Sequence, residues 1–175
     1  MNSYRQNTYN REAAVEYAKR YALSPNPNFK YFGIYANIGG DCTNFTSQCL
    51  LTGGAPMTYG TEYAWWYNNA NTYDTGDDTW SIPWAVAHSL YWTLRVNFQN
   101  NHYGPKGFEV ADINALEIGD LIFYEDDNSI IYHSTIITSF DSSGPLISQH
   151  TFNALNISYL KTWKARFMHF IKVSI

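Results

Sequence analysis

The stretch GGDCTNFTSQCL, residues 39–50, contains both cysteines of the chain and gives the clearest indication of its fold. Asp41 is a residue type that caps helix N-termini, and the segment 53–56, GGAP, is typical of a helix end, so a helix is predicted over residues 42–52. On such a helix Cys42 and Cys49 are about 10 Å apart. A disulfide cannot span that distance, so both thiols are predicted to be free.

Cys42 is predicted to stand at the first position of this helix. Unpaired backbone N–H groups and the helix dipole favour an anion there, so the pKa of the thiol should fall and its backbone amide could donate to an oxyanion. The carboxylate of Asp41 would oppose a thiolate unless it points away or meets a substrate amine. Cys49 shares a helix face with Phe45 and is interpreted as a small buried hydrophobe.

Working outward, the pattern predicts an α+β domain. Apolar spacing and capping residues predict two further helices, over 11–23 behind Asn10 and over 82–97 behind Ser81. Short β-branched and aromatic runs predict antiparallel strands in the second half, at 108–113, 120–125, 130–140, 145–151 and 165–173. Helices followed by strands favour helices packed on one face of an antiparallel sheet. We expect a single domain over residues 1–175, with 1–8 as a flexible extension.

Two histidines on consecutive predicted strands are the candidates for a base beside the thiol. His133 and His150 flank the DSSG turn, and one of them could act as base while the other holds its ring in place. His88, His102 and His169 are interpreted as hydrogen-bonded core or surface imidazoles. Cys42, His133 and His150 could instead be zinc ligands, but no short-spaced ligand pair supports this, so no metal and no cofactor are expected.

Composition limits the possible partners. The chain has 175 residues, 45% of them hydrophobic, and a net charge of −4 without a basic run, which argues against nucleic acid. No apolar run is long enough for a membrane span, and the first residues lack the features of a secretory signal. A monomer is the default expectation. The compartment stays open, since an exported, wall-associated precursor could have lost its leader.

Aromatic residues make up 18% of the chain and are concentrated between Tyr59 and Trp92. Part of this content must belong to the core. The remainder could line a groove that stacks on sugar rings or flat side chains. The candidates for this groove are Tyr63, Trp65, Trp66, Tyr67, Trp80 and Trp84.

Several motifs together resemble one protein family. They are NREAAVEYAKRYAL, GGDCTNFTSQCLLTGGAPM, TWSIPWAVAHSLYWTL, GDLIFY, HSTIITS and SQHT, and they run from about Tyr9 to the last predicted strand. The pattern is similar to the bacterial putative amidase domain of the papain-like superfamily, whose wider members include CHAP and NlpC-type cell-wall hydrolases. The resemblance implies a papain-like fold with Cys42 as nucleophile, His133 as general base and His150 as the orienting third residue.

The resemblance also implies an activity. The expected function is a cysteine amidohydrolase or peptidase that cleaves amide bonds of peptidoglycan peptides through a thioester. Asn37 is the candidate for a second oxyanion donor, and Asn153 is the alternative to His150 as the orienting residue. Two other functions stay open, a non-catalytic wall-binding module on the same fold and a thioester acyltransferase. Which amide bond is cut does not follow from the sequence.

Overall fold

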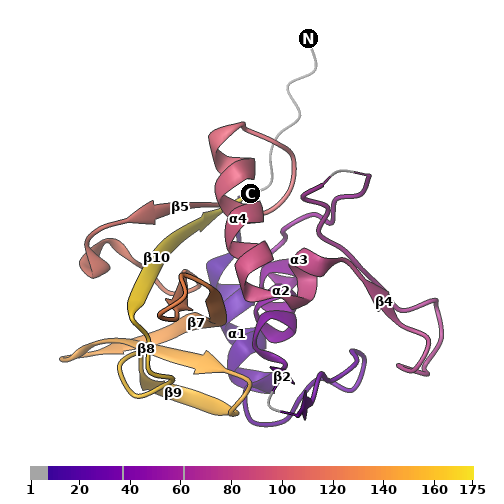
Figure 1. The fold of residues 1–175 in the computed structure, drawn as a ribbon, viewed down its shortest axis with the longest axis horizontal. Coiled ribbons are helices and arrows are strands. Elements are labelled where there is room, and N and C mark those ends of the chain that lie inside the picture. The colour runs from indigo at the N-terminus through magenta and orange to yellow at the C-terminus, as the bar shows by residue number, and fades with distance from the viewer. Residues whose placement is uncertain (1–7, 37, 61) are drawn as a thin grey trace.

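The computed structural model describes residues 8–36, 38–60 and 62–175 (Figure 1). Residues 1–7, which make up nearly all of the expected N-terminal extension, lie outside this described part. No helix within these ranges is both long and apolar enough to cross a membrane.

The fold is α+β, as predicted, with helices from residues 11–99 packed against an antiparallel sheet (Figure 1). The helices are α1 (Arg11–Tyr21), α2 (Cys42–Thr52), α3 (Ile82–Ala85) and α4 (Ala87–Gln99), with a 3-10 turn at Ile113–Ala115. The six-stranded sheet has the order β5-β10-β6-β7-β8-β9. Its strands are β5 (Lys106–Val110), β6 (Leu121–Glu125), β7 (Ile131–Asp141), β8 (Gly144–Gln149), β9 (Ala154–Ser158) and β10 (Phe167–Ser174).

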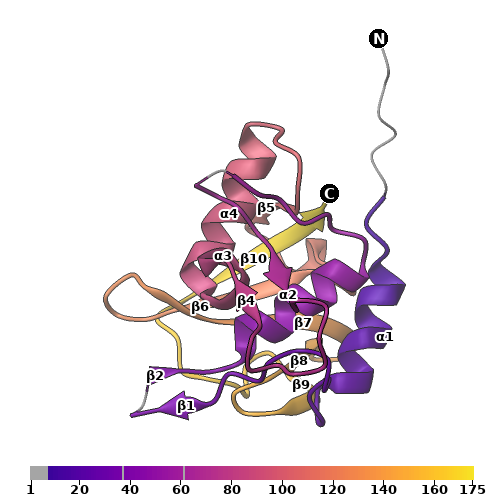
Figure 2. The same ribbon diagram turned by 90° about the vertical axis from the view of Figure 1, so that its right-hand side faces the viewer.

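Two short strand pairs lie outside the main sheet. One joins β1 (Ile34–Tyr35) to β2 (Ile38–Gly39), and the other joins β3 (Tyr67–Asn68) to β4 (Thr79–Trp80). Figure 2 shows the β1–β2 pair at the end of the molecule where β8 and β9 also lie. This end carries the start of α2.

The sheet separates two apolar clusters because successive side chains of a strand point to opposite faces. The larger cluster lies between the sheet and the helices and includes Phe45, Cys49 and Ile136. The smaller cluster lies on the other face around Ile122 and Ile137, and Ile113 of the 3-10 turn packs against it. Cys49 is fully buried, which confirms the interpretation of this thiol as a core residue.

Helix α1 is positioned by its first turn. Asn10 caps it as predicted, since its side chain accepts a hydrogen bond from the N–H of Ala13 at 3.0 Å. In the same turn Arg11 forms an ion pair with the fully buried Asp120 at 2.5 Å. Asp120 also accepts the N–H of Val173, so α1 is tied to the strands β6 and β10.

The predicted single helix over 82–97 is wrong in one respect, because the chain is extended at Val86 and forms α3 and α4. The carbonyl of Trp84 accepts a hydrogen bond from Ser47 of α2 at 2.9 Å. In a continuous helix the Trp84 carbonyl would accept a backbone N–H of the same helix, but here it accepts a hydrogen bond from α2. The break allows Trp84 to be fully buried against Trp65.

Apart from shifts of one or two residues at strand ends, the predicted strands differ from the observed ones at two places. The run 108–113 is strand only up to Val110, and its end leads into the 3-10 turn. Strand β9 was not predicted. Its run, ALNIS, is interrupted by Asn156, which adopts a positive φ of 52° and weakens the alternating pattern.

Candidate active site

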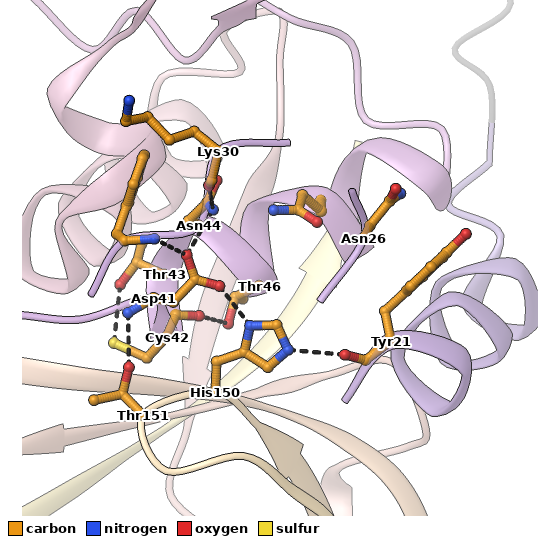
Figure 3. A network of polar contacts seen from close by, with 12 residues as sticks. Tyr21, Asn26, Lys30, Asp41, Cys42, Thr43, Asn44, Thr46, His150 and Thr151 are labelled. Carbon is orange, nitrogen blue, oxygen red and sulfur yellow. Dashed lines mark hydrogen bonds and ion pairs between the residues drawn. The ribbon is translucent and has the colours of Figure 1, made fainter. Parts of the chain in front are cut away.

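Two glycines precede α2, and the second of them is required by a close contact with the turn after β8. Gly39 and Gly40 have φ values of +90° and +127°, which side-chain-bearing residues rarely adopt. A Cβ atom on Gly40 would lie 2.8 Å from Oγ1 of Thr151. That same oxygen accepts the N–H of Asp41 at 2.7 Å (Figure 3). The helix start is therefore held against Thr151.

Asp41 occupies the N-cap position of α2, but its carboxylate does not cap the helix. One oxygen accepts hydrogen bonds from the N–H of Phe32 and from the amide of Asn44, each at 2.8 Å. The other oxygen bonds to Nδ1 of His150 at 2.5 Å (Figure 3). The negative charge is thus turned away from Cys42 and paired, which removes the expected conflict with a thiolate.

His150 is fully engaged by this pair and by α1. Its Nε2 donates to the carbonyl of Tyr21 at 2.8 Å, at the C-terminal end of α1 (Figure 3). The ring stacks on Phe45 with a centroid distance of 4.2 Å and is 1% exposed. His150 therefore lies beneath α2.

The side chain that contacts His133 is Gln149, so the expected contact between His133 and His150 is wrong. Oε1 of Gln149 lies 3.0 Å from Nε2 of His133. Gln149 and His150 are neighbours in the chain, and neighbouring side chains at the end of a strand point to opposite sides. Gln149 comes one residue before His150, the residue expected to orient the imidazole.

The hydrogen bonds of Gln149 fix both its own orientation and that of the imidazole. Its Nε2 donates to the carbonyl of Phe152 at 3.1 Å, and its Oε1 accepts the hydroxyl of Thr162 at 2.6 Å. A carbonyl accepts only, so the oxygen of the amide must face His133. Nε2 of His133 then donates, which leaves Nδ1 as the nitrogen that can take a proton from Cys42.

The Cys42 thiol is shifted toward its ionised form. Burial acts to raise its pKa, but the charge of the His133 imidazole and a hydrogen bond with it act in the opposite direction. Further hydrogen bonds from Thr43 and from the backbone of Ser134 bring the pKa down to about 7. Burial raises the pKa of Cys49 well above its ordinary value. The two free cysteines thus differ sharply, as expected from their positions.

A pocket of about 340 Å³ opens onto Cys42 and His133. Its walls include two aromatic side chains, Tyr132 and Trp163, together with Ile34, Gly39 and Thr151. Trp163 meets the His133 ring edge-on at 6.5 Å and donates its indole N–H to the carbonyl of Thr151 at 2.6 Å. Neither aromatic was singled out from the sequence. Trp163 lies between β9 and β10, where no periodic pattern marks it.

The expected aromatic groove does not line this pocket. Trp65 and Trp84 are fully buried, Tyr67 is buried, and Trp66 and Trp80 are partly buried. The indole N–H groups of Trp65 and Trp84 donate to Ser47 and Asn44 of α2, so both rings position the helix. Tyr63 lines a separate depression beside Trp92. Core packing explains most of this aromatic segment.

Other predicted site residues have different outcomes. Asn37 lies outside the described residues. Asn153 is exposed in the turn between β8 and β9, and within the described part of the chain no hydrogen bond joins it to His133. In the described ranges, no three His, Cys, Asp or Glu side chains are grouped so that they could hold a metal ion.

The arrangement can support nucleophilic chemistry at Cys42. A thiol with a pKa near neutrality lies beside an imidazole whose other nitrogen is held by an amide oxygen. The first backbone hydrogen bond of α2 runs from Phe45 N to Asp41 O, so the amide of Cys42 is not used by the helix. That amide is available to donate to the oxyanion that forms when a thiolate attacks a carbonyl carbon.

Comparison with known families agrees with this chemistry. Residues 8–172 match the family model described as "Putative amidase domain". The chain belongs to this family. Among similar proteins, the uncharacterized protein YhbB of Bacillus subtilis (strain 168) is 31% identical over 83% of this chain and 42% of its own length. The uncharacterized protein YjcM of the same organism is 29% identical over 85% of this chain and 32% of its own length.

The putative amidase domain described here thus spans less than half the length of these two curated relatives. No solved structure matches the chain.

Proposed function

We propose that this domain is a cysteine-dependent amidohydrolase that cleaves amide bonds of bacterial cell-wall peptides through a thioester intermediate. The observation that carries the proposal is that Cys42 and His133 line one pocket while Gln149 contacts the His133 ring from behind. The family description supports an amidase. The order of nucleophile on a helix, then base and polar residue on the following sheet, is the one expected for a papain-like fold.

The proposed reaction begins with proton transfer from the Cys42 thiol to Nδ1 of His133. The thiolate attacks the amide carbon, and the backbone N–H of Cys42 stabilises the resulting oxyanion. A second donor from Asn37 stays a prediction. His133 then protonates the leaving amine, which departs as the thioester forms, and afterwards removes a proton from the water that hydrolyses the thioester. The enzyme returns to its starting protonation state.

Gln149 takes the orienting role in this proposal, and His150 supports the nucleophile helix through Asp41. The substrate class rests on the resemblance to CHAP and NlpC-type wall hydrolases. Tyr132 and Trp163 give the pocket flat walls of a kind that stack on peptide groups and sugar rings.

Digestion of purified peptidoglycan tests the proposed function. We expect the wild-type protein to release fragments whose new amino and carboxyl termini, identified by mass spectrometry, show the bond that is cut. Cys42→Ala should release none of them. Cys49→Ala is the matched control, because this buried thiol lies in the core away from the pocket and should be dispensable for cleavage. Identical fragments from wild type and Cys42→Ala would overturn the proposal.

Replacement of Gln149 tests which residue orients the base. Gln149→Ala frees the His133 ring to rotate, and a misplaced base is expected to lower kcat by about 10²-fold. KM should change much less, because Gln149 lies behind the imidazole. Asn153→Ala, measured in parallel, should leave kcat nearly unchanged, since its side chain is exposed. A larger loss for Asn153→Ala than for Gln149→Ala would contradict this assignment.

A further inference from the structure

A closed chain of buried hydroxyl groups lies beneath the Cys42 sulfur. Thr43 Oγ1 is 3.6 Å from the sulfur and 3.1 Å from Oγ of Ser134 on β7. The Ser134 oxygen is 3.2 Å from Oγ1 of Thr46, which donates to the carbonyl of Cys42 at 2.9 Å. Figure 3 shows the two ends of this chain at Cys42. All three hydroxyl residues are fully buried.

The carbonyl of Cys42 fixes the direction of every hydrogen bond in the chain. A carbonyl only accepts, so the single hydroxyl hydrogen of Thr46 is used there. Thr46 must then accept from Ser134, and Ser134 must accept from Thr43. With its own hydrogen directed at Ser134, Thr43 can only accept from the Cys42 S–H. All four hydrogen bonds of this set can therefore form at the same time only when the thiol is protonated.

Ionisation of Cys42 removes the hydrogen that Thr43 accepts. The sulfur then becomes an anion that needs donors, and the nearest hydroxyl is that of Thr43. Rotation about one C–O bond moves the Thr43 hydrogen from Ser134 to the sulfur. Ser134 still donates to Thr46, so no hydroxyl hydrogen in the chain loses its acceptor. The change costs one neutral hydrogen bond and gains a charge-assisted one, which is stronger.

We propose that Thr43 is a switchable hydrogen-bond donor to the Cys42 thiolate, with its hydroxyl directed at Ser134 in the thiol state and at the sulfur in the thiolate state. This inference rests on the proposed role of Cys42 as nucleophile. In the first proton transfer, the thiol hydrogen turns from Thr43 to Nδ1 of His133 and passes to that nitrogen, while the Thr43 hydroxyl turns to the sulfur. The same hydroxyl returns to Ser134 when the thioester removes the charge.

Several other ionisable groups surround the thiol and must be kept constant in a test. His133 and Tyr132 face the pocket from β7. Asp41 precedes the nucleophile, and its pairing with His150 after β8 keeps that charge turned away. Variants of the hydroxyl chain leave all four groups in place, so a change in titration reports the hydroxyls themselves.

The pH dependence of Cys42 alkylation by iodoacetamide tests the inference without any substrate. The wild-type rate should rise with a midpoint of about 7. Thr43→Val removes the donor but keeps the shape of the side chain, and should raise the midpoint by about one pH unit. Thr43→Ser keeps the hydroxyl and should titrate like the wild type. The midpoint is the chosen readout because a higher thiol pKa also makes the thiolate more nucleophilic, which masks part of the effect on rate at one pH.

Ser134→Ala separates a donor switch from a packing effect. It removes the acceptor that holds the Thr43 hydrogen in the thiol state and keeps the backbone N–H of residue 134. The midpoint should stay or fall, whereas a loss of packing would raise it as in Thr43→Val. An unchanged midpoint in Thr43→Val, or an equal rise in Thr43→Ser or Ser134→Ala, would overturn the inference.

Circular dichroism verifies folding, and Thr43→Ala replaces Thr43→Val if the latter does not fold. Alkylation is independent of peptidoglycan cleavage, so the two proposals fail separately. A shifted midpoint without cleavage of the wall contradicts only the proposed function. Cleavage that depends on Cys42, with an unshifted midpoint in Thr43→Val, contradicts only the role of Thr43.

Discussion

His133→Ala is expected to lower amide hydrolysis by at least about 10³-fold and to remove the reactivity of Cys42 near neutral pH. The imidazole contributes both a base and the largest of the effects that favour the thiolate. Without it, burial of the sulfur prevails, and the pKa of Cys42 should move upward from about 7. The loss should therefore be seen in catalysis and in thiol chemistry together.

Selective alkylation measures the second of these effects. In the wild type, Cys42 should be labelled as the pH rises through about 7, while Cys49 is protected by burial and by its raised pKa. His133→Ala should move the labelling of Cys42 to higher pH. His102→Ala is the matched control, because that imidazole is exposed in a loop. Equal and slow labelling of both cysteines in the wild type would instead favour a binding module without an activated thiol.

Asp41→Ala is expected to destabilise the fold by about 3–5 kcal/mol, because it leaves a buried histidine without its charged partner. The side chains of Asp41 and His150 are each 1% exposed, so water cannot replace the lost contact. The same change removes the acceptor for the Phe32 N–H and for the Asn44 amide. Urea unfolding followed by tryptophan fluorescence gives the free energy of unfolding.

A double-mutant cycle with His150→Phe isolates the pair. Phenylalanine can keep the stacking on Phe45, so the single change tests mainly the lost hydrogen bonds. If the two residues act as a unit, the double variant should be less destabilised than the sum of the single ones, by about 0.5–3 kcal/mol. Additive losses would show that Asp41 and His150 contribute independently.

The local features of the site could be predicted from the sequence. The helix over Cys42–Thr52, the two free thiols and the strand that carries His133 follow from capping residues, glycines and β-branched runs, which act over a few residues. The α+β arrangement follows from the order of these patterns along the chain. The close contact of Gly40 with Thr151 was not predicted, because it joins residues far apart in the sequence.

The partner of His133 could not be predicted, because it depends on strand register. A one-residue change of register exchanges the faces of a strand. Register irregularities occur where β6 pairs with β7, where β7 pairs with β8 and where β8 pairs with β9, the last of them between Ile147 and Gln149. Alternation along the sequence therefore could not decide whether Gln149 or its neighbour faces the imidazole. Trp163 was missed for a related reason, since only tertiary structure brings its turn to the pocket.

Three consecutive residues at the end of β8 contact both His133 and Asp41, the residue that precedes Cys42. Gln149 bonds to His133, while His150 and Thr151 bond to the side chain and the backbone of Asp41. A shift of this tripeptide would move the His133 ring and, through Asp41, the start of α2 in the same direction. The distance between the Cys42 sulfur and the ring should therefore change little during small motions of the fold. Residues 149–151 should therefore be kept intact in engineered variants, because they link His133 to the start of the helix that carries Cys42. Any inserted sequence should be placed elsewhere.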